Sequence, residues 1–316
     1  MKQQYSISKI LLPVDGSEHS KRAIRFTGYL GAAMGDALTN ISLLRVLAGS
    51  YISRHLSYID FRADVLQESD AFKRIREEHI DKNIKPLLDE GERILRDLGV
   101  ESTIDKMLMD GDPANKIVQI ANKKKFSAII MARRGLSEIK EFLLGGVTNK
   151  VVHSAIKQTV YIVGHRIHED KSCPIPGILI PVDGSLYSTN GVKHAASLAG
   201  QLKTVRRITL LRVINLAVFT ERLRGGIDPE EEANKILQGA REVFLKAGIS
   251  DEVIQTRTSV GNPSEEIIKE AEKEDYNLII VGRKGRSALK DLLLGGVSSA
   301  VLHRCQNPTV AIVSGA

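Results

Sequence analysis

The sequence has 316 residues and a formal net charge of +7; 42% of the residues are hydrophobic, only 4% are aromatic, and Trp is absent. At roughly 100–200 residues per domain, this length predicts two domains. The positive charge could suit nucleic acid, but the scarcity of aromatic side chains argues against recognition by base stacking. The two cysteines, Cys173 and Cys305, lie far apart in the sequence, which argues against a disulfide framework and a cysteine metal site. No apolar run approaches the ~20 residues needed to span a membrane. We therefore expect a soluble cytoplasmic protein.

The first half of the chain predicts strands and helices in alternation. Short apolar, β-branched runs predict strands at 7–14, 41–47, 102–109, 128–132 and 159–163. Apolar residues at helical spacing predict helices over 18–34, over 71–98 and from about 146. Pro86 should kink or divide the second of these, and Asp112 followed by Pro113 should cap a further helix. Such alternation predicts a parallel sheet with helices on both faces and ligand-binding loops at one edge.

The second half repeats this pattern from residue 178. We therefore predict a first domain at 1–165, a polar linker at 166–176 and a second domain at 177–316. The halves differ in length mainly at about 48–70, where the first half has an insertion. A long loop on the ligand edge is often functional, so a lid, a contact surface and a tolerated surface excursion all remain open.

The same glycine pattern follows the fourth strand of each half, 150 residues apart. In the second half it reads Gly282-x-x-Gly285, nine residues, then Gly295-Gly296. Glycine permits positive φ and lets an anion approach the backbone, and the helix that begins at Gly296 offers unpaired N–H groups and its positive dipole end. The amides of Val297 and Ser298 and the Ser298 hydroxyl would then donate to phosphate, with added charge from Arg283 and Lys284. The alternative is that the glycines only shape a long turn.

This arrangement resembles the universal stress protein family in its tandem form, across essentially the whole sequence. Besides the glycine loop, the resemblance rests on Pro-x-Asp-x-Ser at 13–17 and 181–185 and on Leu-Leu-x-Val at 43–46 and 210–213. It implies an α/β protein with two tandem Rossmann-like (HUP-type) domains. Each would be a five-stranded parallel sheet with helices on both faces, and the two would associate through their last strands.

The resemblance also implies a nucleotide site. In nucleotide-binding members of the family, the second-strand valine meets adenine through its backbone, the first-strand Pro and Asp lie by the base and ribose, and the glycine loop and the next helix hold the phosphates. Carried over to the second domain, the site residues are Pro181, Asp183, Val213, Val281, Gly282, Arg283, Gly285, Gly295, Gly296, Val297 and Ser298. In the first domain they are Pro13, Asp15, Val46, Met131, Ala132, Gly135, Gly145, Gly146, Val147 and Thr148. The expected ligand is ATP or another adenine nucleotide, with Mg²⁺ held only through its phosphates.

The two copies differ from the family pattern, or from each other, in three ways. Ala132 stands in place of the first glycine, where a methyl group would crowd a ribose or force a different backbone angle. Gly146 and Gly296 replace the usual Ser or Thr, which removes a hydrogen bond of roughly 0.5–1.5 kcal/mol but leaves the backbone N–H. Gln158 stands where the second copy has Pro308. We therefore expect the second domain to hold the better site and the first a degenerate one.

The leading hypothesis is a stress-response regulator or sensor that binds an adenine nucleotide. A scaffold for protein interactions that needs no nucleotide is the alternative. A slow ATP hydrolase ranks lower, because the loop offers Arg and Lys rather than a general base for water. His153 and His303, with no second ligand at metal spacing, are read as packing or surface residues. The two domains should form an intramolecular pair, while a further homodimer and a protein partner remain open.

Overall fold

The computed structural model describes residues 5–48, 70–135, 144–215, 226, 228–285 and 294–314. The predicted strands and helices of the first half are all present. In chain order they are β1 (Lys9–Pro13), α1 (Glu18–Met34), the 3₁₀ turn η1 (Gly35–Ala37), β2 (Asn40–Leu47), α3 (Asp70–His79), the π-helical turn η3 (Ile80–Ile84), α4 (Lys85–Asp97), β3 (Thr103–Asp110), α5 (Pro113–Lys123), β4 (Ala128–Ala132), α6 (Gly146–Ser154) and β5 (Thr159–Val163). The insertion predicted at about 48–70 lies, except for its two end residues, outside the described residues.

The second half repeats this order without an α3 equivalent among its described residues. Its elements are β6 (Gly177–Pro181), α7 (Leu186–Leu202), β7 (Arg207–Asn215), α9 (Pro229–Lys246), the 3₁₀ turn η4 (Asp251–Val253), β8 (Ile254–Gly261), α10 (Pro263–Lys273), β9 (Leu278–Gly282), α11 (Gly296–Arg304) and β10 (Thr309–Val313).

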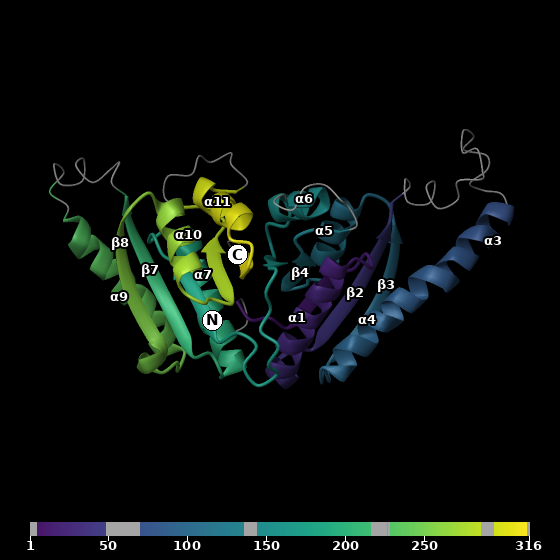
Figure 1. Cartoon of the computed structure of the whole chain (residues 1–316), viewed down its shortest axis with the longest axis horizontal. Coiled ribbons are helices and arrows are strands. Elements are labelled where there is room, and N and C mark those ends of the chain that lie inside the picture. The colour runs from purple at the N-terminus through teal and green to yellow at the C-terminus, as the bar shows by residue number, and fades with distance from the viewer. Residues whose placement is uncertain are drawn as a thin grey trace.

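The ten strands form one sheet in the order β3-β2-β1-β4-β5-β10-β9-β6-β7-β8 (Figure 1). Within each half every pairing is parallel. The halves meet where β5 and β10 pair antiparallel, with Tyr161 opposite Ala311. Both expectations are thereby confirmed: two tandem Rossmann-like domains of five parallel strands, joined through their last strands.

Helix boundaries follow from local chemistry. The Ser17 hydroxyl accepts from the Ser20 N–H and the Ser185 hydroxyl from the Ser188 N–H, so both serines are N-caps. Asp112 caps α5 in the same way, with Pro113 in its first turn. Pro86 has no N–H to donate within a helix, and the regular α-helical pattern is interrupted by η3 immediately before it. The expected division of the 71–98 stretch is confirmed.

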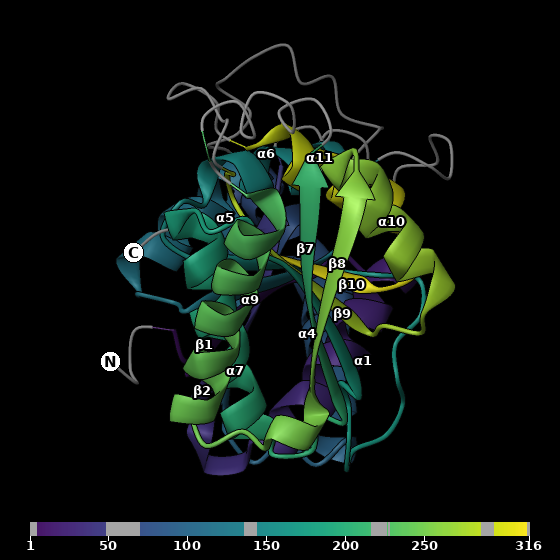
Figure 2. The ribbon, with the colours of Figure 1, turned by 90° about the vertical axis from the view of Figure 1, so that its left-hand side faces the viewer.

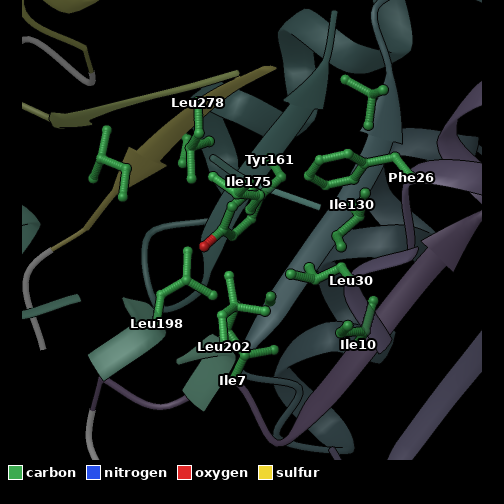
Figure 3. Close-up of a cluster of buried hydrophobic side chains, with 14 of the residues drawn as sticks. Ile7, Ile10, Phe26, Leu30, Ile130, Tyr161, Ile175, Leu198, Leu202 and Leu278 are labelled. Carbon is green, nitrogen blue, oxygen red and sulfur yellow. The ribbon is translucent and has the colours of Figure 1, made fainter. Parts of the chain in front are cut away.

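Helices cover both faces of the sheet, and each of the two cores runs through both domains. On one face α1, α4, α7 and α9 bury a single apolar cluster, and on the other α5, α6, α10 and α11 bury a second. Figure 3 shows the first cluster at the joint, where Phe26, Leu30 and Tyr161 of the first domain lie close to Leu198 and Leu202 of α7. Because neither domain buries this surface alone, the domains form one folded unit.

The segments flanking the first domain also pack against the second. Tyr5 donates its hydroxyl to Asn190 at 2.9 Å, and its carbonyl accepts from His194 Nδ1 at 2.9 Å. The linker is less polar in its packing than the sequence suggests: Ile175 is 1% exposed, and the buried Cys173 thiol donates to the Thr204 carbonyl. No helix among the described residues is both long and apolar enough to cross a membrane.

Candidate functional site

A cleft of about 290 Å³ lies at the carboxyl edge of the second-domain sheet, where β6, β7 and β9 end (Figure 2 shows this edge at the top). This is the edge at which parallel α/β sheets bind ligands. Of the residues predicted for this site, the cleft is lined by Pro181, Asp183, Val213, Val281, Gly282, Gly285, Val297 and Ser298. The structure thus brings together residues from three strands and a helix that lie up to 117 positions apart in the sequence.

One wall of the cleft is apolar. Leu211 and Val213 alternate along β7, so both face the same side of the sheet, and Val281 of β9 and Ile267 of α10 join them in one buried cluster. An apolar wall with a few polar groups beside it is the usual make-up of a small-molecule site. Ile267 was not predicted, because α10 reaches the cleft only through the tertiary fold.

The start of α11 forms the other end of the cleft. Its N-cap is Gly295, which has no side chain to accept from the N–H groups of the first turn. The Ser298 hydroxyl, expected to donate to phosphate, donates instead to the Gly282 carbonyl at 2.6 Å. Backbone N–H groups are therefore the donors that this helix end offers. A Cβ added at Gly296 would meet nothing within 4 Å, so the missing Ser or Thr side chain would have room.

Asp183 holds the turn between β6 and α7. Its Oδ1 accepts from the Ser185 N–H at 2.9 Å, which fixes the backbone just before α7. A Cβ added at Gly285 would come within 2.8 Å of Asp183 Oδ2. A side chain at this position would displace the carboxylate, which packs directly against the loop, and the same pair recurs as Asp15 and Gly135.

Gly282 is required by packing. A Cβ at this position would lie 2.5 Å from the carbonyl carbon of Tyr187 and 2.8 Å from the Ser188 nitrogen, so the first turn of α7 rests on the glycine. In the first domain the methyl of Ala132 lies in the buried cluster beneath α1, whereas its neighbour Met131 belongs to the cluster of the opposite face. The methyl therefore packs into the core, and the expectation that it would crowd a ribose stays a prediction.

The structure also corrects the expected role of Arg283. This residue is 3% exposed and is not among the residues lining the cleft. Its Nη2 donates to the Ala155 carbonyl at 2.8 Å and its Nε to the Ser314 hydroxyl at 2.9 Å, so its charge is used at the domain boundary. Burial lowers the pKa of Arg283, and it lowers that of the equivalent Arg133 to about 10, which leaves Arg133 charged at neutral pH. Among the described residues of this loop, Lys284 is the cation that lines the cleft.

Two charged residues that the sequence did not single out also line the cleft. Arg212 of β7 and Glu232 of α9 lie 3.8 Å apart as an ion pair, 11% and 24% exposed. Arg212 was visible inside the Leu-Leu-x-Val motif. Glu232 had no local signal, because only the fold of α9 over β7 brings it to this edge.

The glycines that precede α6 and α11, and His303, make hydrogen bonds within their own loop or helix. Gly295 donates its N–H to the Arg283 carbonyl and Gly145 donates to the Arg133 carbonyl, both at 2.8 Å, which ties the two ends of each glycine loop together. His303 Nδ1 donates to the Ser299 carbonyl within α11, and burial lowers the pKa of His153. Among the residues that the structure describes, no three His, Cys, Asp or Glu side chains are grouped as metal ligands.

Comparison with known proteins agrees with this geometry. The model of the universal stress protein family matches the chain twice, at residues 6–163 and 176–313. The chain belongs to the universal stress protein family. Its two matched segments coincide with the two halves of the sheet, so it carries two universal stress protein domains in tandem.

Relatives within the universal stress protein family cover either the whole chain or one half. The chain is 25% identical over 313 residues to a universal stress protein of Mycolicibacterium smegmatis, with 96% of both chains covered. It is 42% identical over 154 residues to the universal stress protein MJ0577 of Methanocaldococcus jannaschii, covering 43% of this chain and 93% of that protein. The crystal structure of a universal stress protein from Archaeoglobus fulgidus has the same fold, with a TM-score of 0.64 at 20% identity over 99% of this chain and 100% of that one.

Proposed function

We propose that the cleft of the second domain binds an adenine nucleotide, with ATP as the first candidate, and that the protein acts as a nucleotide-dependent sensor or regulator of a stress response. One observation carries the proposal: a single cleft joins an apolar wall to the start of α11 and Lys284. An apolar wall suits a base, and a helix N-terminus with a neighbouring cation suits phosphate.

The residues of the cleft suggest how the nucleotide would lie. The base would pack beside Val213 and Val281, the ribose near Pro181 and Asp183, and the phosphates at Gly285 and the first turn of α11. A magnesium ion would enter with the nucleotide and be held through its phosphates. The carboxylates of Asp183 and Glu232 give the cleft negative charge as well, and Arg212 pairs with Glu232. Lys284 and the helix N-terminus would then add the attraction for the polyphosphate.

The equivalent residues of the first domain form the second, weaker part of the proposal. Asp15, Gly135, Gly145 and Thr148 repeat the turn, the loop and the helix start. The Thr148 hydroxyl donates to the Ala132 carbonyl at 3.0 Å, as Ser298 does to Gly282. We place the higher affinity in the second domain, whose loop keeps the first glycine, Gly282, where the first domain has Ala132.

Calorimetric titration with ATP, AMP and cAMP tests the proposal. We expect ATP to bind with a dissociation constant below about 1 mM, which is about 4 kcal/mol of binding free energy. Gly285→Val should abolish this binding because its side chain would enter the space beside Asp183, while the matched variant Gly135→Val should leave most of it. Absence of binding below millimolar concentration, or binding unaffected by Gly285→Val, would contradict the proposal.

Two further measurements address the alternatives. Protein purified from cells and then denatured should release adenine nucleotide; a scaffold independent of nucleotide would release none. Phosphate release from ATP should be no faster than in buffer, because we propose binding without hydrolysis. We also propose a cytoplasmic location, which cell fractionation tests, and recovery with the membrane or secreted fraction would contradict it.

A further inference from the structure

Arg133 and Arg283 each reach out of their own domain. Arg133 follows β4 and donates to the carbonyls of Leu302 and Cys305 at the end of α11, the latter at 3.4 Å. Arg283 follows β9 and donates to the carbonyls of His153 and Ala155 at the end of α6, at 3.4 and 2.8 Å. Residues 155 and 305 are equivalent, so each arginine reaches the same place on the opposite copy. Figure 1 shows α6 and α11 facing each other across the joint.

These contacts satisfy hydrogen-bonding groups on both the helix ends and the arginines. The last carbonyls of a helix have no partner within the helix, and this end carries partial negative charge. A buried guanidinium, in turn, needs acceptors for its N–H groups. Arg133 and Arg283 are 7% and 3% exposed, so neither can rely on water for them. Each arginine thus caps the helix of the other domain.

The helix that Arg133 caps is the one whose start lies in the cleft. α11 has nine residues and is only about 13 Å long. A helix this short is marginal by itself, so its position depends on what holds its ends. Its start is held by the bond from the Ser298 hydroxyl to Gly282 and its end by Arg133. We infer that Arg133, a first-domain residue, is a positioning residue for the phosphate-binding end of the second-domain site.

The same hydrogen bonds connect the two glycine loops through α6 and α11, so that each loop is linked to the other in both directions. Ser298 bonds to Gly282, whose neighbour Arg283 caps α6; Thr148 of α6 bonds to Ala132, whose neighbour Arg133 caps α11. A ligand that draws the start of α11 toward itself therefore acts on Arg133 and, through it, on the first-domain loop. Two short rigid helices with both ends held are a physical route for coupling between the sites. This inference rests on the proposed nucleotide function.

The test combines a binding measurement with one that needs no ligand. In Arg133→Met we expect backbone amides 299–302 of α11 to exchange hydrogen faster in the nucleotide-free protein, and the dissociation constant for ATP to rise on the order of tenfold. Arg133→Lys should show smaller changes in the same direction, because one ammonium keeps the charge but cannot span both carbonyls. Arg166→Met is the matched control: Arg166 also lies at the domain boundary, but its exposed side chain pairs with Asp275 and should affect neither readout.

The outcomes separate this inference from the proposed function. If the wild type binds no ATP, the proposed function fails, and faster exchange confined to α11 still supports the positioning role. If Arg133→Met does not fold, Arg133→Lys decides by the same two readouts. Wild-type exchange and wild-type affinity in the folded variant would overturn the inference, as would equal changes in Arg166→Met.

Discussion

Replacing Gly282 by alanine should destabilise the protein without changing any charge or hydrogen-bonding group. The new Cβ would lie 2.5 to 2.8 Å from three backbone atoms of Tyr187 and Ser188, where ordinary contact begins near 3.4 Å. These atoms belong to the start of α7, so the whole first turn would have to withdraw by close to an ångström. Overpacking of this kind costs about 1–3 kcal/mol.

A second contribution to the free energy of unfolding has the opposite sign and reduces this cost. Alanine restricts the unfolded chain more than glycine, which favours the folded state by about 0.4–1 kcal/mol. We therefore expect a loss of about 1–2 kcal/mol in the free energy of unfolding. Because Gly282 also lines the cleft and accepts from Ser298, ATP affinity should fall in the same variant.

Urea unfolding followed by circular dichroism measures this loss. Gly296→Ala is the matched control, since its Cβ meets nothing within 4 Å, and it should change stability by no more than about 0.5 kcal/mol. Equal unfolding midpoints for Gly282→Ala, Gly296→Ala and the wild type would refute the reasoning, because α7 would then yield to the methyl at no cost.

Three further predictions concern pH, the phosphate end and a helix cap. Burial lowers the pKa of His194 to about 4, so the folded state favours the neutral ring; this stability is present above about pH 6.5 and is lost as the pH falls toward 4, by about 3 kcal/mol in all. Urea unfolding measured between about pH 7.5 and 4.5 should show that the unfolding free energy falls more steeply with decreasing pH in the wild type than in His194→Gln. Parallel plots of unfolding free energy against pH would contradict this. Gly296→Ser should tighten ATP binding by about two- to tenfold, because the open space at this position admits a hydroxyl worth roughly 0.5–1.5 kcal/mol; unchanged calorimetric affinity would place the phosphates elsewhere. Ser185→Ala should cost about 1 kcal/mol in unfolding free energy through loss of the bond to Ser188, and an unchanged midpoint would argue against the cap.

Features set by neighbouring residues in the chain could be predicted from the sequence. The strands, the cap at Asp112 and the interruption at Pro86 depend on a few adjacent residues, and all of them were predicted. The meeting of strand ends at one edge follows from parallel topology alone. For that reason most of the predicted site residues of the second domain line one cleft.

Features set by the other domain could not be predicted in this way. The sequence places Arg283 inside a glycine loop, which suggests that it binds phosphate. Its contact with the end of α6 arises only because β5 and β10 pair antiparallel at the joint. Glu232 reaches the cleft because α9 packs over β7, which no local pattern encodes. The direction of the Ala132 methyl was available from strand alternation, since neighbours along a strand face opposite sides. Ile175, an apolar residue within a polar linker, was the sign that this segment packs.

The antiparallel joint within one chain has a consequence for how the two halves can differ. Two separate copies joined in this manner would come apart on dilution, whereas the linker keeps the halves at a fixed, high effective concentration. Separation of the two halves should therefore not depend on protein concentration, as it would for two separate copies. Two identical subunits must also share every substitution. In this chain an alanine can stand at 132 and a glycine at 282, so each half is free to change at a position where the other does not.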